Sequence, residues 1–201
     1  MARPKLHDDA LRVRLLEQAV RTLSEDGPEG LRLRKLAADV GTSTTAVYSL
    51  FGGKPGLLDA LFDEAFTRFG RRLAEVEFRG DARTDMMALG LAYRANALAE
   101  PHFYQVMFGP VGGAVTPSPE SRTRAEGTFE PLVEAVRRAI DAGQIRDADP
   151  TLVATTMWAT VHGLVSLELR GLLPEAAGEA TEIYRQTLRA MGEGWATPRS
   201  S

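Results

Sequence analysis

The chain has 201 residues, of which 44% are hydrophobic and 25% charged, and its formal net charge is −3. These values are typical of an ordinary globular protein with one large domain or two small ones. The sequence contains no cysteine, which excludes a disulfide framework and a thiolate metal site and fits a reducing compartment. Residues 1–55 hold 9 Lys and Arg against 7 Asp and Glu, and the rest of the chain holds 15 against 20. This distribution favours contact with DNA at the N-terminal end only.

Apolar residues recur at helical spacing along the whole chain, and no segment alternates with the period of a strand, which predicts an all-α fold of about nine helices. Residues 109–124 are rich in Gly, Pro and Ser and are predicted to form a loop. Asp149 followed by Pro150 is a strong helix start. The uncharged stretch 152–167 is short for a bilayer and contains His162, so we expect a buried helix and no membrane segment. The predicted helices span 8–25, 33–40, 44–50, 54–78, 84–99, 103–108, 126–142, 150–169 and 175–191.

The segment 31–54 has the most distinctive pattern. Leu36 and Val40 lie on one apolar face of the first short helix, and Gly41 is placed to end it. Ser43 is placed to cap a second short helix. Two helices joined by a turn of this length form the geometry that places a helix in the major groove of DNA, although a plain helical hairpin inside a bundle fits the same spacing.

Polar side chains around this hairpin are candidate contacts to DNA. Lys54 lies at the start of the next helix, where a phosphate can bind, and the Tyr48 hydroxyl can reach a phosphate too. Plain surface and core roles are the alternatives for these two residues, and capping is the alternative for the hydroxyl residues. Since no Arg, Asn or Gln lies between residues 42 and 50, base reading is expected to depend on methyl contacts, water, DNA shape and the preceding arginines. The candidate DNA-binding residues are Arg32, Arg34, Thr42, Ser43, Thr44, Thr45, Tyr48 and Lys54.

A series of short motifs follows at fixed spacing: Leu33-Arg34-Lys35-Leu36-Ala37, Val40-Gly41-x-Ser43, Ala46-Val47-Tyr48-x-x-Phe51, Lys54 and Leu57-Leu58. With these motifs, residues 8–70 resemble the N-terminal domain of the TetR family of transcriptional regulators. The resemblance implies a three-helix helix-turn-helix domain in which Tyr48 and Lys54 touch phosphate. Two positions depart from the family pattern: Arg32 stands where a Thr or Ser commonly caps a helix, and Leu50 stands where a polar residue, often His, is frequent.

The C-terminal part resembles the type named for its Trp-His-Gly signature, here Trp158, His162 and Gly163, which implies a helical ligand-sensing and dimerisation body. The hydrophobic pattern also indicates dimerisation, because the helix predicted over 150–169 is apolar on nearly every side and must be covered on several faces. Pairing helices of about 150–170 and 175–191 with those of a second copy makes a four-helix bundle. We therefore predict a DNA-binding domain over 1–53, a larger ligand-binding and dimerisation domain over 54–194, and a tail over 195–201.

Aromatic and methionine side chains on the central helices are candidates for the lining of a pocket for a small apolar or aromatic effector. Ordinary core packing is the alternative for each of them. For His162 the alternative is a hydrogen-bonded core histidine. The candidate lining residues are Phe66, Phe69, Tyr93, Phe103, Met107, Phe108, Phe129, Trp158 and His162.

These features together predict a cytoplasmic, ligand-responsive transcriptional repressor. It would bind a palindromic double-stranded DNA operator as a homodimer and be released by the effector. A DNA-binding dimer without an effector is the alternative. A helical enzyme is disfavoured, because the histidines, at positions 7, 102 and 162, show no metal-ligand spacing and no Gly-rich phosphate loop follows a strand. No metal or cofactor is expected.

Overall fold

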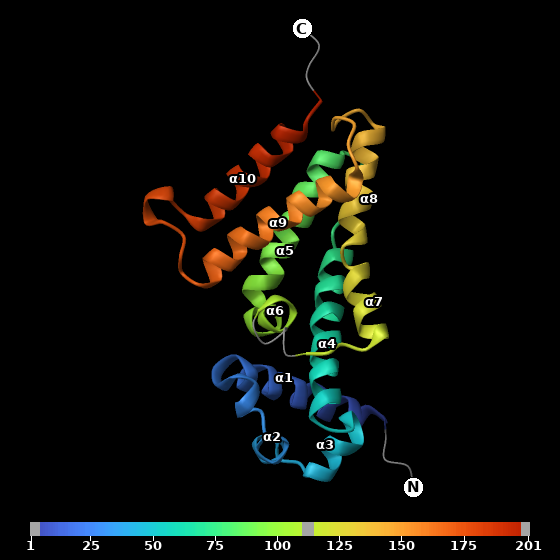
Figure 1. Ribbon diagram of the computed structural model, residues 1–201, viewed down its shortest axis with the longest axis vertical. Helices are drawn as coiled ribbons and strands as arrows, with labels where there is room; N and C mark the ends of the chain where they lie inside the picture. Colours follow the sequence, from blue (N-terminus) through green and yellow to red (C-terminus); the bar gives the residue numbers. More distant parts are fainter. Residues whose placement is uncertain (1–4, 110–114, 198–201) are drawn as a thin grey trace. The chain divides into compact units, whose positions relative to one another are not determined.

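The computed structural model describes residues 5–109 and 115–197, and within these ranges the regular structure is helical (Figure 1). The predicted all-α class is therefore confirmed. The one β-type pairing in the described part is an isolated bridge between Ile145 and Ala196. The helices are α1 (Lys5–Gly30), α2 (Leu33–Val40), α3 (Thr44–Phe51), α4 (Lys54–Ala74), α5 (Ala82–Ala99), α6 (Pro101–Phe108), α7 (Pro119–Gly127), α8 (Glu130–Asp141), α9 (Pro150–Leu169), the 3-10 turn η2 (Glu175–Ala177) and α10 (Ala180–Trp195).

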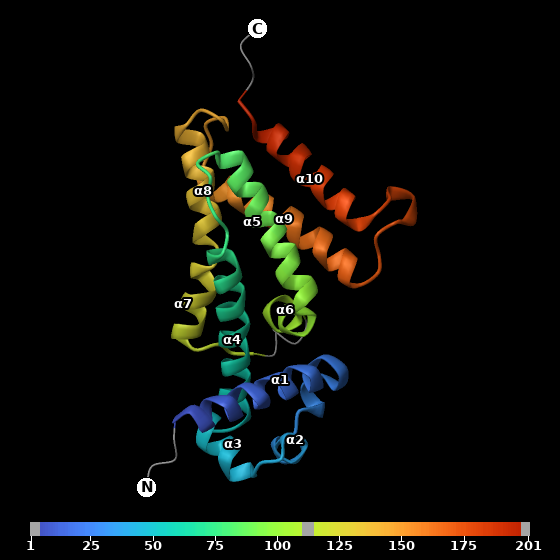
Figure 2. The same cartoon turned by 180° about the vertical axis from the view of Figure 1, so that it is seen from behind.

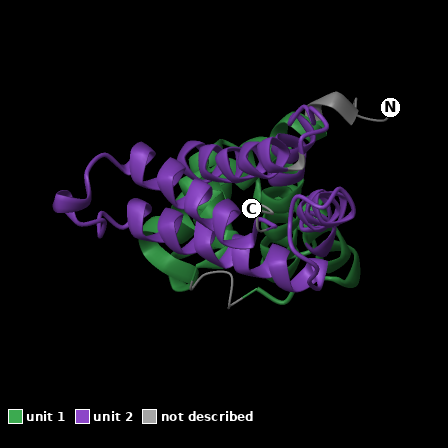
Figure 3. Cartoon of the chain, turned by 90° about the horizontal axis from the view of Figure 1, so that it is seen from above, with its two compact units in different colours: residues 1–68, 100–125 green, residues 69–99, 126–201 purple. Residues whose placement is uncertain are grey.

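The chain divides into two compact units, coloured separately in Figure 3. Unit 1 comprises residues 1–68 and 100–125, and unit 2 comprises residues 69–99 and 126–201. The chain thus leaves unit 1 within α4, directly after Arg68, and returns to it at Glu100, directly before α6. The predicted division into 1–53, 54–194 and a tail stays a prediction. Of that tail, Trp195 ends α10, Ala196 forms the bridge, and residues 198–201 lie outside the described residues.

In unit 1 the first three helices form one small core. Leu15, Leu16 and Val20 of α1 are at most 2% exposed, and α1 contacts α2, which contacts α3. Gly27 interrupts α1 with a φ of 70°, in the region that glycine adopts without steric cost, so the helical direction breaks two residues after the predicted end at residue 25, and α1 begins at Lys5 rather than at residue 8. Leu36 of α2 and Val47 of α3 complete this core. The hairpin therefore presents its opposite side to solvent.

A single guanidinium joins three elements of unit 1. Arg68 of α4 donates from Nε to Glu64 Oε1 (2.8 Å), from Nη1 to Glu100 Oε1 (3.3 Å) and from Nη2 to Glu17 Oε1 of α1 (2.6 Å). Its Cζ also lies 4.2 Å from the ring centroid of Phe103 on α6. Burial alone would lower the pKa of Arg68, but hydrogen bonds to Glu64 and Glu17 outweigh it and raise that pKa. We call Arg68, Glu17, Glu64 and Glu100 the Arg68 cluster.

Unit 2 is built on α5, α8 and α9, which contact one another, with α10 against α5 and α9, as both Figure 1 and Figure 2 show. Arg94 of α5 forms a two-point ion pair with Glu168 of α9, with its Nε 2.8 Å from Oε2. Its Nη2 also donates to Thr181 Oγ1 at the start of α10 (3.2 Å). The Tyr184 hydroxyl of α10 donates to the Gly90 carbonyl of α5 (2.8 Å). These polar contacts fix α10 in the unit.

Among the described helices, α9 is the one that is long and apolar enough to cross a membrane by length and composition alone. Within the chain, 28% of its most apolar stretch is buried. Its N-terminus is capped as predicted, because the Asp149 carboxylate accepts from the Leu152 amide (2.8 Å). Met157 and Val165 face the interior, whereas Leu152 is 56% exposed. The chain alone therefore leaves an apolar face of α9 uncovered.

Several predicted boundaries are wrong. Residues 119–124 of the predicted loop belong to α7, which is polar on all sides and so carries no apolar periodicity; residues 110–114 of that loop lie outside the described residues. The predicted helix over 126–142 is two elements, since α7 ends at Gly127 and α8 begins at Glu130. Helix α4 ends at Ala74, before Phe78.

Two other boundaries shift because of local capping and loop geometry. Helix α5 begins at Ala82, since Asp81 is its cap and accepts from the Thr84 amide (2.9 Å). The last predicted helix, 175–191, is divided by Gly178 (φ 95°) into η2 and α10, which extends to Trp195. The last turn of α10, Gly192 to Trp195, has one large apolar residue, which is too few to predict where the helix ends.

We expect Arg68→Met to lower the free energy of unfolding by about 1–3 kcal/mol, because Glu17 and Glu100 would lose this cation and Glu64 would keep a longer ion pair with Arg12 (4.0 Å). Arg124→Met is the matched control: Arg124 pairs with Asp63 at 2.6 Å, but its side chain is 52% exposed against 17% for Arg68. Urea unfolding of both variants measures the difference. Equal losses would contradict a special role for the Arg68 cluster.

Candidate nucleic-acid interface

The turn between α2 and α3 has the geometry of a helix-turn-helix. Gly41 adopts φ 71° and ψ 41°, a left-handed conformation that ends α2, and the Thr42 amide donates to the Ala37 carbonyl (2.8 Å). Ser43 Oγ then accepts from the Ala46 amide (3.1 Å) and caps α3. The turn therefore consists of residues 41–43, and both predicted caps are present.

Hydroxyl side chains occupy the outer face of α3. Thr45, Tyr48 and Ser49 are exposed, and Tyr48 is 54% exposed, so the alternative of a core tyrosine is wrong. Thr42 and Thr44 are half-buried beside them, whereas Val47 and Phe51 point into the core. No residue of α3 carries a charge, so no carboxylate on this helix would repel phosphate. The face can accept and donate hydrogen bonds without electrostatic penalty.

Ser49 belongs to this face and was missed by sequence reasoning. It is exposed and lies one helical turn after Thr45, so their hydroxyls share one side of α3. The sequence signal for Ser49 was its spacing of four residues from Thr45, which places both residues on the same side of a helix. We add Ser49 to the candidate DNA contacts.

The two candidate arginines lie at the start of α2. Arg32 and Arg34 are exposed, and Arg32 occupies the N-cap position without a side-chain cap bond, as its departure from the family pattern implied. Lys35 beside them is exposed as well and forms an ion pair with Asp26 (3.8 Å). Exposed cations of this kind contribute little to stability, and Arg32 and Arg34 stay candidates for phosphate contacts.

Lys54 has a partner within the protein. Its Nζ donates to the Pro28 carbonyl (2.6 Å) and so fastens the start of α4 to the end of α1. An ammonium group carries three donors, so this bond leaves capacity for a phosphate oxygen. Lys54 therefore combines a structural contact with a position at the N-terminus of α4, where the helix amides favour an anion.

The candidate pocket residues are divided between the two units. In unit 1, Phe103 and Met107 of α6 are buried, and the rings of Phe66 and Phe108 lie 5.8 Å apart. In unit 2 the other five form a continuous chain of ring contacts. The centroid separations are 5.4 Å for Phe69–Tyr93, 5.8 Å for Phe129–Trp158 and 6.0 Å for Trp158–His162, and the Tyr93 hydroxyl lies 2.9 Å from His162 Nδ1.

His162 is held neutral by its surroundings. Burial lowers its pKa below the ordinary value of 6.5. The Tyr93 hydroxyl can then donate to an unprotonated Nδ1. His162 is half-buried and hydrogen-bonded within unit 2, and its role as a ligand contact stays a prediction. Within the described ranges no group of three acidic or histidine side chains is arranged to hold a metal ion.

Comparison with protein families identifies this architecture. Residues 15–61 match the family model described as bacterial regulatory proteins, tetR family, and residues 86–191 match the one described as tetracyclin repressor-like, C-terminal domain. The second match alone spans more than half of the chain. The name of this C-terminal family does not mention the Trp-His-Gly signature, so the likeness of Trp158, His162 and Gly163 to that type stays a resemblance.

Individual relatives are similar to this chain over most of its length. The chain is 29% identical over 191 residues to the HTH-type transcriptional repressor AcnR of Corynebacterium glutamicum, covering 89% of this chain and 92% of that protein. It is 25% identical over 195 residues to the HTH-type transcriptional regulator Rv1816 of Mycobacterium tuberculosis, covering 81% and 82%. A solved structure from Rhodococcus sp. RHA1, of unknown function, superposes with a TM-score of 0.78 at 31% identity, covering 92% and 95%.

The chain therefore belongs to the TetR family of bacterial transcriptional regulators. It is a DNA-binding regulator and not an enzyme, and DNA is its partner.

We expect His162 to make stability pH-dependent. The pKa of His162 is lower in the folded chain than in the unfolded chain. As the pH falls through 6.5, the unfolded chain therefore takes up a proton at His162 before the folded chain does. The contribution of His162 to the free energy of unfolding is thus fully present above pH 6.5 and decreases below it. In His162→Asn the loss between pH 7.5 and 5.5 should be smaller, by less than about 1 kcal/mol after solvent screening. Urea unfolding at both values measures this. An identical loss in both proteins would show that His162 does not contribute.

Proposed function

We propose that this regulator is a cytoplasmic repressor that binds a palindromic operator as a homodimer and is released by a small apolar or aromatic effector. The observation that carries the proposal is the exposed, uncharged hydroxyl face of α3 in a helix-turn-helix, with Arg32 and Arg34 exposed at the start of α2. A relative that spans most of this chain is named a transcriptional repressor, which supports repression as the output.

The proposed reading mode is anchored on phosphate. Tyr48, Lys54, Arg32 and Arg34 would bind the DNA backbone and fix the position of α3 in the major groove. The hydroxyls of the α3 face would contact base edges or thymine methyl groups. Since α3 has no side chain that makes bidentate contacts with a base, DNA shape would supply much of the specificity. Affinity for DNA should therefore fall steeply with salt.

The uncovered faces of α9 and α10 support a homodimer. On α9 the exposed residues follow a helical stripe of Leu152, Thr155, Ala159 and Leu167. On α10 most of the side chains are exposed or half-buried, and Ile183 is half-buried. Packing these two helices against their mates would form the predicted four-helix bundle and give a two-fold symmetry that matches a palindromic operator.

The effector part of the proposal rests on the family and on the aromatic cluster of unit 2. Phe69 of α4 packs on Tyr93, Trp158 packs on His162, and Phe129 packs on Trp158, so the Tyr93–His162 hydrogen bond is a polar contact between aromatic neighbours. An effector that binds better to a dimer whose reading helices are wrongly spaced would shift the population away from the DNA-bound form. A DNA-binding dimer without an effector remains the second candidate.

We expect Tyr48→Phe to weaken binding to all DNA sequences about equally, by up to about tenfold, because a neutral phosphate contact is lost. Lys54→Met should in addition reduce the slope of log K against log salt by about 0.9, because one phosphate contact by a cation is lost. Fluorescence anisotropy at several salt concentrations, with circular dichroism to verify folding, measures both effects. A loss restricted to one base pair would contradict the assignment to phosphate.

We expect Ala159→Glu to produce a folded monomer, because it places a carboxylate in the proposed α9 interface. Ala95→Glu makes the same change at an exposed position of α5 and should remain a dimer. Sedimentation velocity at micromolar concentration distinguishes the two. Unchanged sedimentation of both variants as a dimer would place the interface elsewhere, and a wild-type monomer would overturn the dimer altogether.

A further inference from the structure

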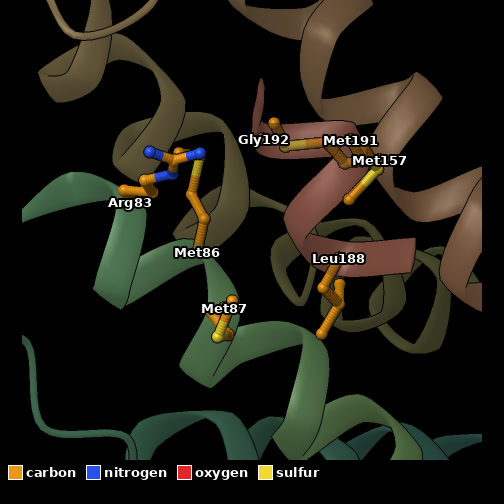
Figure 4. Close-up of a pocket in the computed structure, with 7 residues that line it drawn as sticks. All are labelled: Arg83, Met86, Met87, Met157, Leu188, Met191 and Gly192. Atoms are coloured by element: carbon orange, nitrogen blue, oxygen red, sulfur yellow. The ribbon is translucent and has the colours of Figure 1, made fainter. Parts of the chain in front are cut away.

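Unit 2 contains a small cavity of about 20 Å³ lined largely by methionines (Figure 4). Met86 and Met87 extend from α5, Met157 comes from α9 and Met191 from α10, so four of the six methionines of the chain line one pocket. The remaining lining residues are Arg83, Leu188 and Gly192. We call this the methionine pocket.

The pocket has a buried floor and an open rim. Met86 and Met157 are 8% and 3% exposed, whereas Met87 and Met191 are half-buried. At the rim Gly192 leaves space, since a Cβ there would lie 3.6 Å from Arg83 Nε. The Arg83 guanidinium is paired with Glu193 of α10 (3.7 Å). The pocket therefore offers thioether sulfur and hydrocarbon to whatever enters it, with the Arg83 guanidinium at the rim.

Size and chemistry restrict the occupant. A cavity of about 20 Å³ admits one water-sized molecule, far less than the roughly 300–1,000 Å³ of a site for a drug-sized ligand. Hydrogen peroxide is only slightly larger than water. Because the sequence has no cysteine, the thioethers are its only readily oxidised sulfur atoms.

We propose that the methionine pocket is an oxidation site for peroxides and that sulfoxide formation there loosens α10 from α5. A thioether lone pair attacks one oxygen of hydrogen peroxide, the O–O bond breaks, and the departing hydroxide takes up the proton that the transferred oxygen releases. The products are a sulfoxide and water. The sulfur loses two electrons and the peroxide gains them. Met87 and Met191 at the rim react first, and Met86 follows as the pocket opens.

The position of the pocket explains the effect on α10. Helices α5 and α10 approach closely at Gly90, where a Cβ would lie 2.8 Å from Leu188 Cδ2. Leu188 also lines the pocket, so the same contact forms its wall. Arg83 of α5 is the lining residue that carries a side-chain hydrogen-bond donor, and its guanidinium is paired with Glu193 of α10. A sulfoxide oxygen in this otherwise apolar space draws Arg83 away from Glu193 or is hydrated as the helices separate, and either change loosens α10 from α5. If α10 forms the dimer as proposed above, its displacement weakens the dimer; that last step alone depends on the proposed function.

The reactivity is tested with hydrogen peroxide and mass mapping of tryptic peptides. Met107 is the internal control, because its exposed fraction of 7% is close to the 8% of Met86. It lies on α6 in unit 1 and does not line the pocket. At low peroxide we expect Met87 and Met191 to be oxidised first, and Met86 about tenfold faster than Met107. Equal rates for Met86 and Met107 would overturn the assignment of the pocket as an oxidation site.

The structural response is tested by hydrogen exchange of the α10 amides. Peroxide should speed their exchange about tenfold in the wild-type chain and leave a Met87→Leu, Met191→Leu variant unchanged, since leucine keeps the volume and cannot be oxidised. Methionine sulfoxide reductases with a dithiol should restore slow exchange, as the dithiol becomes a disulfide and the oxygen leaves as water. Unchanged exchange in the oxidised wild type, or equal loosening of the variant, would overturn the proposal. Neither readout uses DNA, so failure of the proposed operator binding would leave both results unaffected.

Discussion

The hydrogen bonds from Arg68 to three carboxylates are the constraint on which the arrangement of unit 1 depends. The guanidinium binds Glu17 of α1, Glu64 of its own helix and Glu100 before α6, and each nitrogen has its own carboxylate. Arg68 and Glu100 are also the residues at which the chain leaves and re-enters unit 1. One side chain therefore joins three parts of unit 1: the helix in which the chain leaves the unit, the residue at which it returns, and α1.

The placement of α2 and α3, the helices proposed to contact DNA, follows from this anchoring. Helices α2 and α3 are short, and their core contacts run through α1, so the hydroxyl face of α3 takes its direction from α1. Two further contacts hold the same group: Lys54 binds the Pro28 carbonyl, and the Arg14 guanidinium binds the Val40 carbonyl at the end of α2. Cations thus join the ends of helices, which also places positive charge near the proposed DNA-binding surface.

The sequence predicts the features of this fold that depend on near neighbours. The caps at Gly41, Ser43 and Asp149 each involve residues at most five positions apart, so local chemistry reveals them. The Arg68 cluster could not be predicted, because Glu17 and Glu100 lie 51 and 32 positions away and a charged pattern on a helix surface looks solvated until the helices are packed. Helix α7 was missed because it is polar on all sides. Tyr48 and Lys54 were found as candidates, but the exposure of one and the internal bond of the other required the structure.

The most direct test of the central claim, that α3 reads a palindromic operator, is selection of genomic DNA fragments by the purified chain followed by sequencing. The account predicts that the enriched fragments share an inverted repeat with half-sites about one helical turn, or a multiple of it, apart. It also predicts that the enrichment disappears when Thr45, Tyr48 and Ser49 are replaced together by alanine. Enrichment without a shared repeat, or a shared site that survives this triple substitution, would contradict it.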